Sequence, residues 1–209
     1  MIPAGSFLSS VLTRLRPARE DARGKRFVAV IECLLNQNAR DRDTAAYPAL
    51  NSAVLALCEK HGVGLLQIPC PEIRLLGLNR DRPPGASIRA CLETGEGQRC
   101  CREISEEIVV RMRAYLDQGV ELLAVLGGNP ESPGCAVHAS ASVCISAPEQ
   151  VLDARSGILM QTLAEAMQAA SIRAPLRGIR DYRPDLLEAD LRWLEQRFLE
   201  TADHPKPHI

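Results

Sequence analysis

Four short apolar runs, separated by stretches with helical periodicity, constrain the fold of this chain more than any other feature of its sequence. The runs cover residues 27–31, 64–68, 122–126 and 172–179, and the first three are mostly apolar, as is typical of strands buried on both faces of a sheet. Apolar residues elsewhere recur at helical spacing, which predicts helices near residues 48–62, 104–119, 159–170 and 184–198. The alternation predicts a single α/β domain, with a mostly parallel sheet and helices on both faces in a Rossmann-like three-layer arrangement.

The 209 residues fit one domain with short additions at each end. Residues 1–26 are Arg-rich and interrupted by Pro17 and Gly24, so we expect an N-terminal extension. The α/β domain is then expected over residues 27–201, with a tail over residues 202–209. Residues 69–99 are rich in Pro, Gly and Arg, which predicts a long irregular stretch of the kind that tends to carry function.

The composition argues against several classes of partner. Lys and Arg number 25 against 26 Asp and Glu, a balance that offers no overall attraction to DNA or anionic lipid. Aromatic residues make up 3%, too few for base-stacking surfaces, and no apolar run approaches the ~20 residues that span a bilayer. The apolar patch at residues 7–12 is shorter than a secretory signal core. We therefore expect a cytoplasmic monomer or homodimer that binds neither DNA nor membrane.

Eight cysteines are the most unusual part of the composition. In a reducing cytoplasm they favour metal binding or catalysis over disulfides. Three of them, Cys33, Cys70 and Cys135, each follow the end of one of the first three predicted strands. Because ligands of open parallel sheets bind outside the carboxyl ends of the strands, we expect these thiols to meet at one edge of the sheet.

Three convergent thiols admit more than one kind of site. Their spacings, 37 and 65 residues, differ from the closely paired cysteines of zinc fingers, although His138 could complete a zinc site in a metal-binding module without catalysis. The other candidate is a [4Fe-4S] cluster held by Cys33, Cys70 and Cys135, with one iron open to a substrate atom. A sulfur carrier that uses the same three cysteines is a third interpretation.

Four short sequence motifs add to this pattern: Cys33-Leu34-Leu35-Asn36, Cys70-Pro71-Glu72, Arg82-Pro83-Pro84 and Ser132-Pro133-Gly134-Cys135. In this order they resemble the motifs of the thiouracil desulfurase (desulfidase) family, over about residues 27–145. The resemblance implies a [4Fe-4S] cluster on the three cysteines, supplied by the iron–sulfur assembly machinery. It also implies removal of sulfur, as hydrogen sulfide, from a thiocarbonyl small molecule by non-redox C–S cleavage with water.

The resemblance also suggests roles for individual residues. Glu72 matches the family's catalytic glutamate and could move a proton between water and substrate. Ser132 matches the family's functional serine and could hydrogen-bond the substrate, although a plain turn residue is the other interpretation. Substrate-binding residues are expected at four further positions: Asn36, Arg40, Gly128 and Arg82. Of these, Arg40 falls where the family usually has an arginine, and Gly128 lets the backbone approach a ligand closely.

The chain departs from the family pattern at three places near the expected site. Asn36 stands where the family usually has glycine, and the run from Arg40 to Asp43 lacks the family's tyrosine. In the motif that contains Cys135, Gly134 and Ala136 replace a serine and a glycine. None of these changes a cluster ligand, so the resemblance supports the chemistry better than it supports any one substrate.

Arginines of the irregular stretch carry a weaker expectation. Arg74, Arg80 and Arg82 could recognise an anionic group of a substrate by paired hydrogen bonds, although such a run is more often a solvated loop face.

The remaining cysteines are also expected to have minor roles. Cys100 and Cys101 precede the second predicted helix, where the helix dipole could activate a vicinal dithiol, but a mobile loop with incidental thiols is the favoured interpretation. Cys58 and Cys144 are expected in the core, and Cys91 in a loop.

Overall fold

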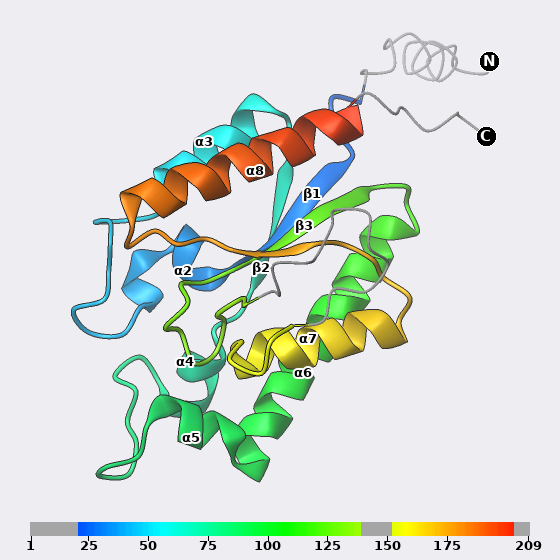
Figure 1. Ribbon diagram of the computed structural model, residues 1–209. Coiled ribbons are helices and arrows are strands. Elements are labelled where there is room, and N and C mark those ends of the chain that lie inside the picture. The colour runs from blue at the N-terminus through cyan, green and yellow to red at the C-terminus, as the bar shows by residue number, and fades with distance from the viewer. Residues whose placement is uncertain (1–20, 139–151, 203–209) are drawn as a thin grey trace, which may run out of the picture.

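The computed structural model describes residues 21–138 and 152–202 and confirms the α/β fold (Figure 1). Cys144 and residues 1–20 of the expected extension lie outside the described residues, as do residues 139–151 and 203–209. Four strands form one sheet in the order β2-β1-β3-β4, and every pairing is parallel. The strands are β1 (Arg26–Ile31), β2 (Gly64–Ile68), β3 (Glu121–Gly127) and β4 (Leu176–Gly178).

Burial of the strands follows their place in the sheet. In the two central strands, the side chains of residues 28–30 and 123–126 have no exposed surface. The outer strand β2 instead alternates at its end, with Leu66 and Ile68 buried and Leu65 and Gln67 exposed. Continuous apolar runs therefore mark the strands that are covered on both faces, as expected for a parallel sheet.

Helices cover both faces of the sheet, which confirms the three-layer arrangement. Helices α3 (Ser52–Lys60) and α8 (Pro184–Ala202) pack together on one face, and α6 (Gly95–Leu116) and α7 (Ile158–Ala169) pack together on the other (Figure 1). Apolar stripes face the sheet: α6, for example, buries Ile104, Ile108 and Met112. Among the helices that the structure describes, none combines the length and apolar character needed to cross a bilayer.

The prediction of an irregular stretch over residues 69–99 is wrong. This stretch contains α4 (Pro71–Leu76), α5 (Ile88–Glu93) and the first turn of α6. Its turn-forming residues begin helices: Pro71 occupies the first turn of α4, where a missing N–H costs little. The Ser87 hydroxyl accepts the Ala90 N–H at 3.0 Å, and Thr94 caps α6 in the same way. The polar and turn-forming residues of this stretch are therefore the caps and first turns of helices, and not parts of an irregular loop.

Three smaller differences concern element boundaries. Helix α3 begins at Ser52, capped by the Asn51 side chain, and not near Pro48. Two short helices that were not predicted, α2 (Glu32–Leu35) and the 3-10 helix η1 (Gln37–Ala39), follow β1. Strand β4 is shorter than predicted: Pro175 has no N–H to donate, and its carbonyl accepts the Val125 N–H at 2.9 Å just before the strand begins.

The corner between α5 and α6 gives a test of this part of the fold. A methyl group on Gly97 would lie 2.3 Å from the Cys91 carbonyl oxygen and 2.5 Å from the Leu92 Cα, whereas a methyl group on Gly95 would meet nothing within 4 Å. We expect Gly97→Ala to lower the free energy of unfolding by ~1–3 kcal/mol because backbone must shift. Gly95→Ala, the matched control, should be neutral or slightly stabilising because alanine favours helix. Urea unfolding followed by circular dichroism measures both, and equal stabilities would contradict the tight corner.

Candidate functional site

The carboxyl edge of the sheet receives all three predicted ligand cysteines. Cys33 lies in α2 directly after β1, and Cys70 is the residue that precedes α4, after β2. Cys135 lies in the turn that follows β3, and its carbonyl accepts the Gly128 N–H at 2.7 Å, which folds this turn back on the strand end. The structure thus places the three cysteines where the parallel strands end, as the sequence predicts.

Two of these thiols, Cys33 and Cys135, are hydrogen-bonding neighbours. The hydrogen bond from Cys135, helped by the positive charge of Arg40, lowers the pKa of the Cys33 thiol. The same pairing and burial raise the pKa of Cys135 well above its ordinary value. Removal of a first proton from the pair is therefore easier than from an isolated thiol, and removal of the second is harder.

Gly128 makes the approach of Cys135 possible. A Cβ atom on this residue would lie 2.7 Å from Cys135 Sγ and 3.2 Å from Ile31 Cδ1. The close approach that the structure shows at Gly128 is therefore to the cysteine sulfur and not to a ligand. Contact between Gly128 and a substrate stays a prediction.

Cys70 is held by two charged side chains. Its backbone N–H donates to Glu32 Oε2 at 2.8 Å, and Arg80 Nη2 lies 3.8 Å from its sulfur. Burial, and next the negative charge of Glu72, raise the pKa of the Cys70 thiol to about 12. Glu32 is the first residue of α2, and its carboxylate joins the end of β1 to the start of α4.

The turn that carries Ser132 and Cys135 is pressed between two helices. Its carbonyl groups at Pro133 and Gly134 accept the N–H groups of Ile158 and Leu159, the first residues of α7, at 3.0 Å each. These are backbone donors that have no partner within the helix, so α7 fixes the turn with groups that are otherwise unsatisfied. Ser132 Oγ lies 3.0 Å from Cys135 Sγ, which places the predicted catalytic serine against a predicted ligand sulfur.

Gly134, one of the departures from the family pattern, lies where this turn contacts the first residues of α4. A Cβ atom there would lie 2.8 Å from Pro71 Cγ and 3.2 Å from Glu72 Oε1. The turn therefore approaches α4 too closely for any larger residue, and this contact brings Glu72 next to the segment of Cys135.

Glu72 is buried and paired with a buried cation. Only 10% of its side chain is exposed, and its Oε2 accepts a hydrogen bond from Arg80 Nε at 3.2 Å. The side chain of Arg80 is 1% exposed, so the interpretation of a solvated loop face is wrong for this arginine. Arg74 behaves differently: it forms an ion pair with Glu107 at 2.8 Å on the exposed surface of α6.

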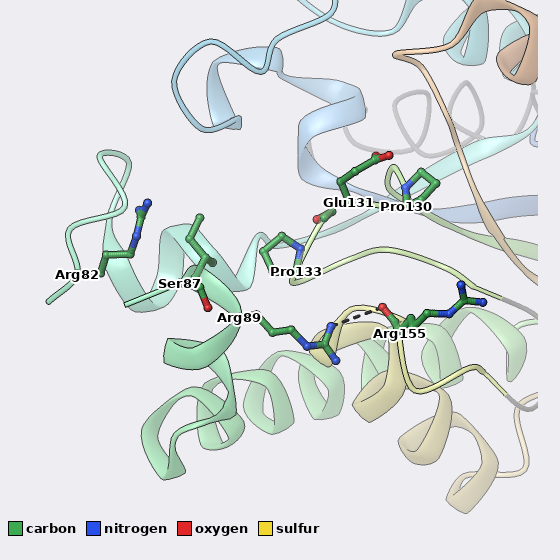
Figure 2. A pocket seen from close by; sticks show the side chains of 9 residues that line it. Arg82, Ser87, Arg89, Pro130, Glu131, Pro133 and Arg155 are labelled. Atoms are coloured by element: carbon green, nitrogen blue, oxygen red, sulfur yellow. Dashed lines mark hydrogen bonds between the residues drawn. The ribbon is translucent and has the colours of Figure 1, made fainter. Parts of the chain in front are cut away.

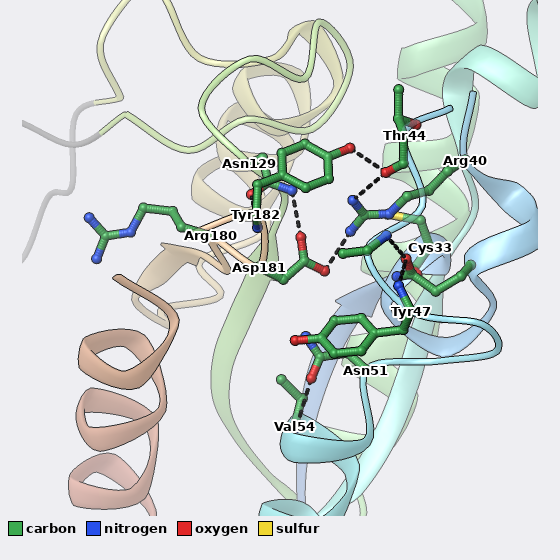
Figure 3. Close-up of polar contacts among 12 residues, drawn as sticks. Cys33, Arg40, Thr44, Tyr47, Asn51, Val54, Asn129, Arg180, Asp181 and Tyr182 are labelled. Atoms are coloured by element: carbon green, nitrogen blue, oxygen red, sulfur yellow. Dashed lines mark hydrogen bonds and ion pairs between the residues drawn. The ribbon is translucent and has the colours of Figure 1, made fainter. Parts of the chain in front are cut away.

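Arg40 lies in a polar network that joins three strand ends (Figure 3). Its Nη2 donates to Asp181 Oδ2 at 2.6 Å, and Asp181 Oδ1 accepts from Asn129 Nδ2 at 2.7 Å. The ring of Tyr182 lies 5.0 Å from the Arg40 guanidinium carbon. Burial alone would lower the pKa of Arg40, but the charges of Cys33 and Asp181 raise it above its ordinary value.

Asp181 and Asn129 are site residues that the sequence analysis missed. Both are buried, and they follow β4 and β3 respectively, so the rule that pointed to the cysteines also applies to them. The signal in the sequence is the position of Asp181, which comes shortly after the end of the fourth strand. The side chain of Arg40 is only 6% exposed, and its charge is paired within this network. Contact between Arg40 and substrate stays a prediction.

The two other expected substrate-binding residues, Asn36 and Arg82, are exposed. Asn36 is exposed, and its side-chain oxygen accepts the Asn38 N–H at 3.1 Å as a local cap. Arg82 is exposed and lines an open pocket of about 370 Å³ on the outer side of the Ser132 turn (Figure 2). Arg89, Arg155, Glu131 and Ser132 also line this pocket, so the predicted serine lies at its wall among charged side chains. Arg89 and Arg155 are paired with Glu93 and Asp153.

His138 is not grouped with the cysteines. Its Nε2 lies 2.8 Å from the Pro130 carbonyl oxygen, which it contacts as a turn-stabilising side chain. Within residues 21–138 and 152–202, no three His, Cys, Asp or Glu side chains are close enough to hold one metal ion together. A four-iron cluster binds each protein ligand through a different iron and therefore requires thiols around a larger volume.

The other cysteines are mostly structural. Cys58 is buried in α3 as expected, and burial raises its pKa to about 11. Cys100 and Cys101 do not precede the helix but lie inside α6, so both the activated dithiol and the mobile loop are wrong. Both thiols are buried, and burial raises the pKa of Cys101 to about 12. Cys91 is in α5 and not in a loop.

Comparisons with known proteins give one weak relationship. The chain is 24% identical over 103 residues to the uncharacterized protein MJ0003 of the archaeon Methanocaldococcus jannaschii, a match that covers 49% of this chain. The match spans 64% of the length of that relative, slightly less than two thirds. No family model matches the chain, and no solved structure matches it.

The unequal thiols of the site predict unequal chemical reactivity in protein without metal. Thiolate is the reactive form, so Cys33, whose pKa is lowered, should react with iodoacetamide at lower pH than Cys70, whose pKa is about 12. Mass spectrometry of protein labelled between about pH 6 and pH 9 should find Cys33 modified well before Cys70. Cys135→Ala, which removes the hydrogen bond to Cys33, should move Cys33 labelling to higher pH. Equal labelling of Cys33 and Cys70 would contradict this account.

Proposed function

We propose that this chain is an iron–sulfur-dependent desulfidase. It removes sulfur as hydrogen sulfide from a thiocarbonyl small molecule, with water as the second reactant, so that C=S and H₂O become C=O and H₂S without oxidation or reduction. The observation that carries the proposal is that three cysteines, each placed after the end of a parallel strand, and one buried carboxylate, Glu72, lie at the carboxyl edge of the sheet. Neither the fold nor the distant archaeal relative bears on the activity.

The residues at this edge fit a cluster with one iron left free. Three thiols come from three separate strand ends, and among the described side chains no three His, Cys, Asp or Glu form a group that could hold a single metal ion. Cys33, Cys70 and Cys135 would hold a [4Fe-4S] cluster through their sulfurs. When bound, such a cluster supplies an exposed iron that acts as a Lewis acid toward a thiocarbonyl sulfur.

The chain's own side chains supply the acid–base chemistry. Glu72 lies two residues after Cys70 and touches the turn that carries Cys135, so its carboxylate is next to two ligand positions. From there it accepts a proton from the attacking water and returns one to the departing sulfur. Ser132 Oγ lies 3.0 Å from Cys135 Sγ, and the residue also lines the open pocket, so its hydroxyl orients the substrate.

Replacement of Glu72 tests this assignment. We expect Glu72→Gln to keep its iron content but to release hydrogen sulfide from thiouracils about 10²- to 10⁴-fold more slowly, because glutamine has similar shape and cannot move a proton. Colorimetric detection of sulfide under anaerobic conditions measures the rate. Glu107→Gln is the matched control, because it also removes a carboxylate that pairs with an arginine, but on the exposed surface of α6. Undiminished sulfide release by a loaded Glu72→Gln protein would remove Glu72 from the mechanism.

A further inference from the structure

Arg80 occupies an unusual position for an arginine. Its side chain is 1% exposed, and its backbone has a φ of 55°, in the left-handed region that non-glycine residues rarely adopt. It lies in the turn after α4, where its N–H donates to the Gly77 carbonyl at 3.2 Å. A strained backbone and a buried charge are both unfavourable by themselves, so the contacts of this side chain must offset them.

The guanidinium of Arg80 is shared among four segments. Nε donates to Glu72 Oε2 at 3.2 Å, and Nη2 donates to the Ala39 carbonyl at 2.7 Å. Nη1 donates to the carbonyls of Gly77 and Leu78. The Nη2 atom also lies 3.8 Å from Cys70 Sγ. One planar group therefore touches the carboxylate and one of the sulfurs that the proposed function uses, and connects both to the segment after β1.

The shape of this group matters as much as its charge. A guanidinium directs five N–H bonds in fixed directions, whereas a lysine ammonium cannot reach several separated acceptors in the same plane. An N–H group that points at a ligand sulfur also stabilises the more negatively charged, reduced state of a bound cluster, and so raises its reduction potential. A purely structural ion pair would leave that potential unchanged.

We propose that Arg80 is a positioning residue of the site, which fixes the Glu72 carboxylate relative to the Cys70 sulfur and donates an N–H to that sulfur. This inference rests on the proposed function, because Glu72 and Cys70 are taken as the proton carrier and a cluster ligand. It gives a role to an arginine for which the sequence suggests either recognition of an anionic substrate group or a solvated loop face.

The test compares Arg80→Gln and Arg80→Lys with the wild-type protein, each reconstituted with iron and sulfide without oxygen. Arg26→Gln is the matched control: Arg26 is a partly buried arginine that donates to the carbonyls of His61 and Phe198 at the opposite end of β1. Two properties are measured, the midpoint potential of the cluster by a titration monitored by electron paramagnetic resonance, and kcat and KM for sulfide release from thiouracil.

For Arg80→Gln we expect wild-type iron content, a midpoint potential shifted to more negative values, and a kcat lowered by about tenfold or more with little change in KM. The unequal effect on kcat and KM distinguishes positioning of Glu72 from loss of substrate binding. Arg80→Lys should shift the midpoint potential and kcat in the same directions, because lysine keeps the positive charge but lacks the planar guanidinium. Arg26→Gln should match the wild type in both measurements.

Three results would overturn parts of the account, and they can be told apart. A loaded and active wild type whose potential and kcat are unchanged in Arg80→Gln overturns the role of Arg80 alone. If Arg80→Gln takes up no cluster, the midpoint potential and kcat of Arg80→Lys are compared with the wild type instead. If neither variant takes up a cluster, Arg80 has a structural role, and the inference is overturned. Wild-type protein that takes up no cluster overturns the proposed function itself, and the inference with it.

Discussion

The parallel pairing of β1 with both β2 and β3 is the constraint on which the candidate site depends. The β1–β2 ladder runs without a break, and the β1–β3 ladder has one register shift between Phe27 and Val28. Beyond this shift Ile31 lies opposite Ile68 and Val30 lies opposite Leu126, so the three strands stop at one edge. The chain leaves β1 and β2 directly into the helices α2 and α4, and after β3 it makes the turn that carries Cys135, well before α7 begins at Ile158. Cys33, Cys70 and Cys135 lie in these segments, and their placement at one edge of the sheet is a consequence of strand direction rather than of their spacing along the chain.

Close backbone contacts then bring the turns together. Gly128 allows the Cys135 sulfur to lie against the end of β3, and Gly134 allows the same turn to lie against Pro71 and Glu72. The start of α7 also packs against this turn, since a Cβ on Gly157 would lie 2.4 Å from the Cys135 nitrogen. Three glycines thus occur where a side chain would separate the cysteine turn from its neighbours. Elsewhere around the site, charged side chains hold the segments together: Glu32 accepts the Cys70 N–H, and Arg80 donates to Glu72.

The sheet, its layers and the placement of the three cysteines could be predicted because they depend on local patterns. Apolar runs identify strands, helical stripes identify helices, and parallel topology determines which turns meet. The helices between residues 69 and 99 could not be recognised in this way, because α4 and α5 have only six residues each. The residues that begin α5 and α6, Ser87 and Thr94, are helix caps that also occur in loops. The partners of buried charges also escaped prediction: Asp181 meets Arg40 across 141 residues, and the left-handed backbone of Arg80 has no sequence signal.

The central claim is that the three cysteines hold an iron–sulfur cluster, and the most direct measurement is iron and acid-labile sulfide per chain in protein prepared without oxygen. The account predicts about four of each in the wild type, with the visible absorbance of a cluster. It predicts their loss in Cys70→Ala and their retention in Cys58→Ala, which removes a buried thiol in α3 that is not at the sheet edge. Wild-type protein that binds neither iron nor sulfide, even after anaerobic reconstitution, would contradict the claim.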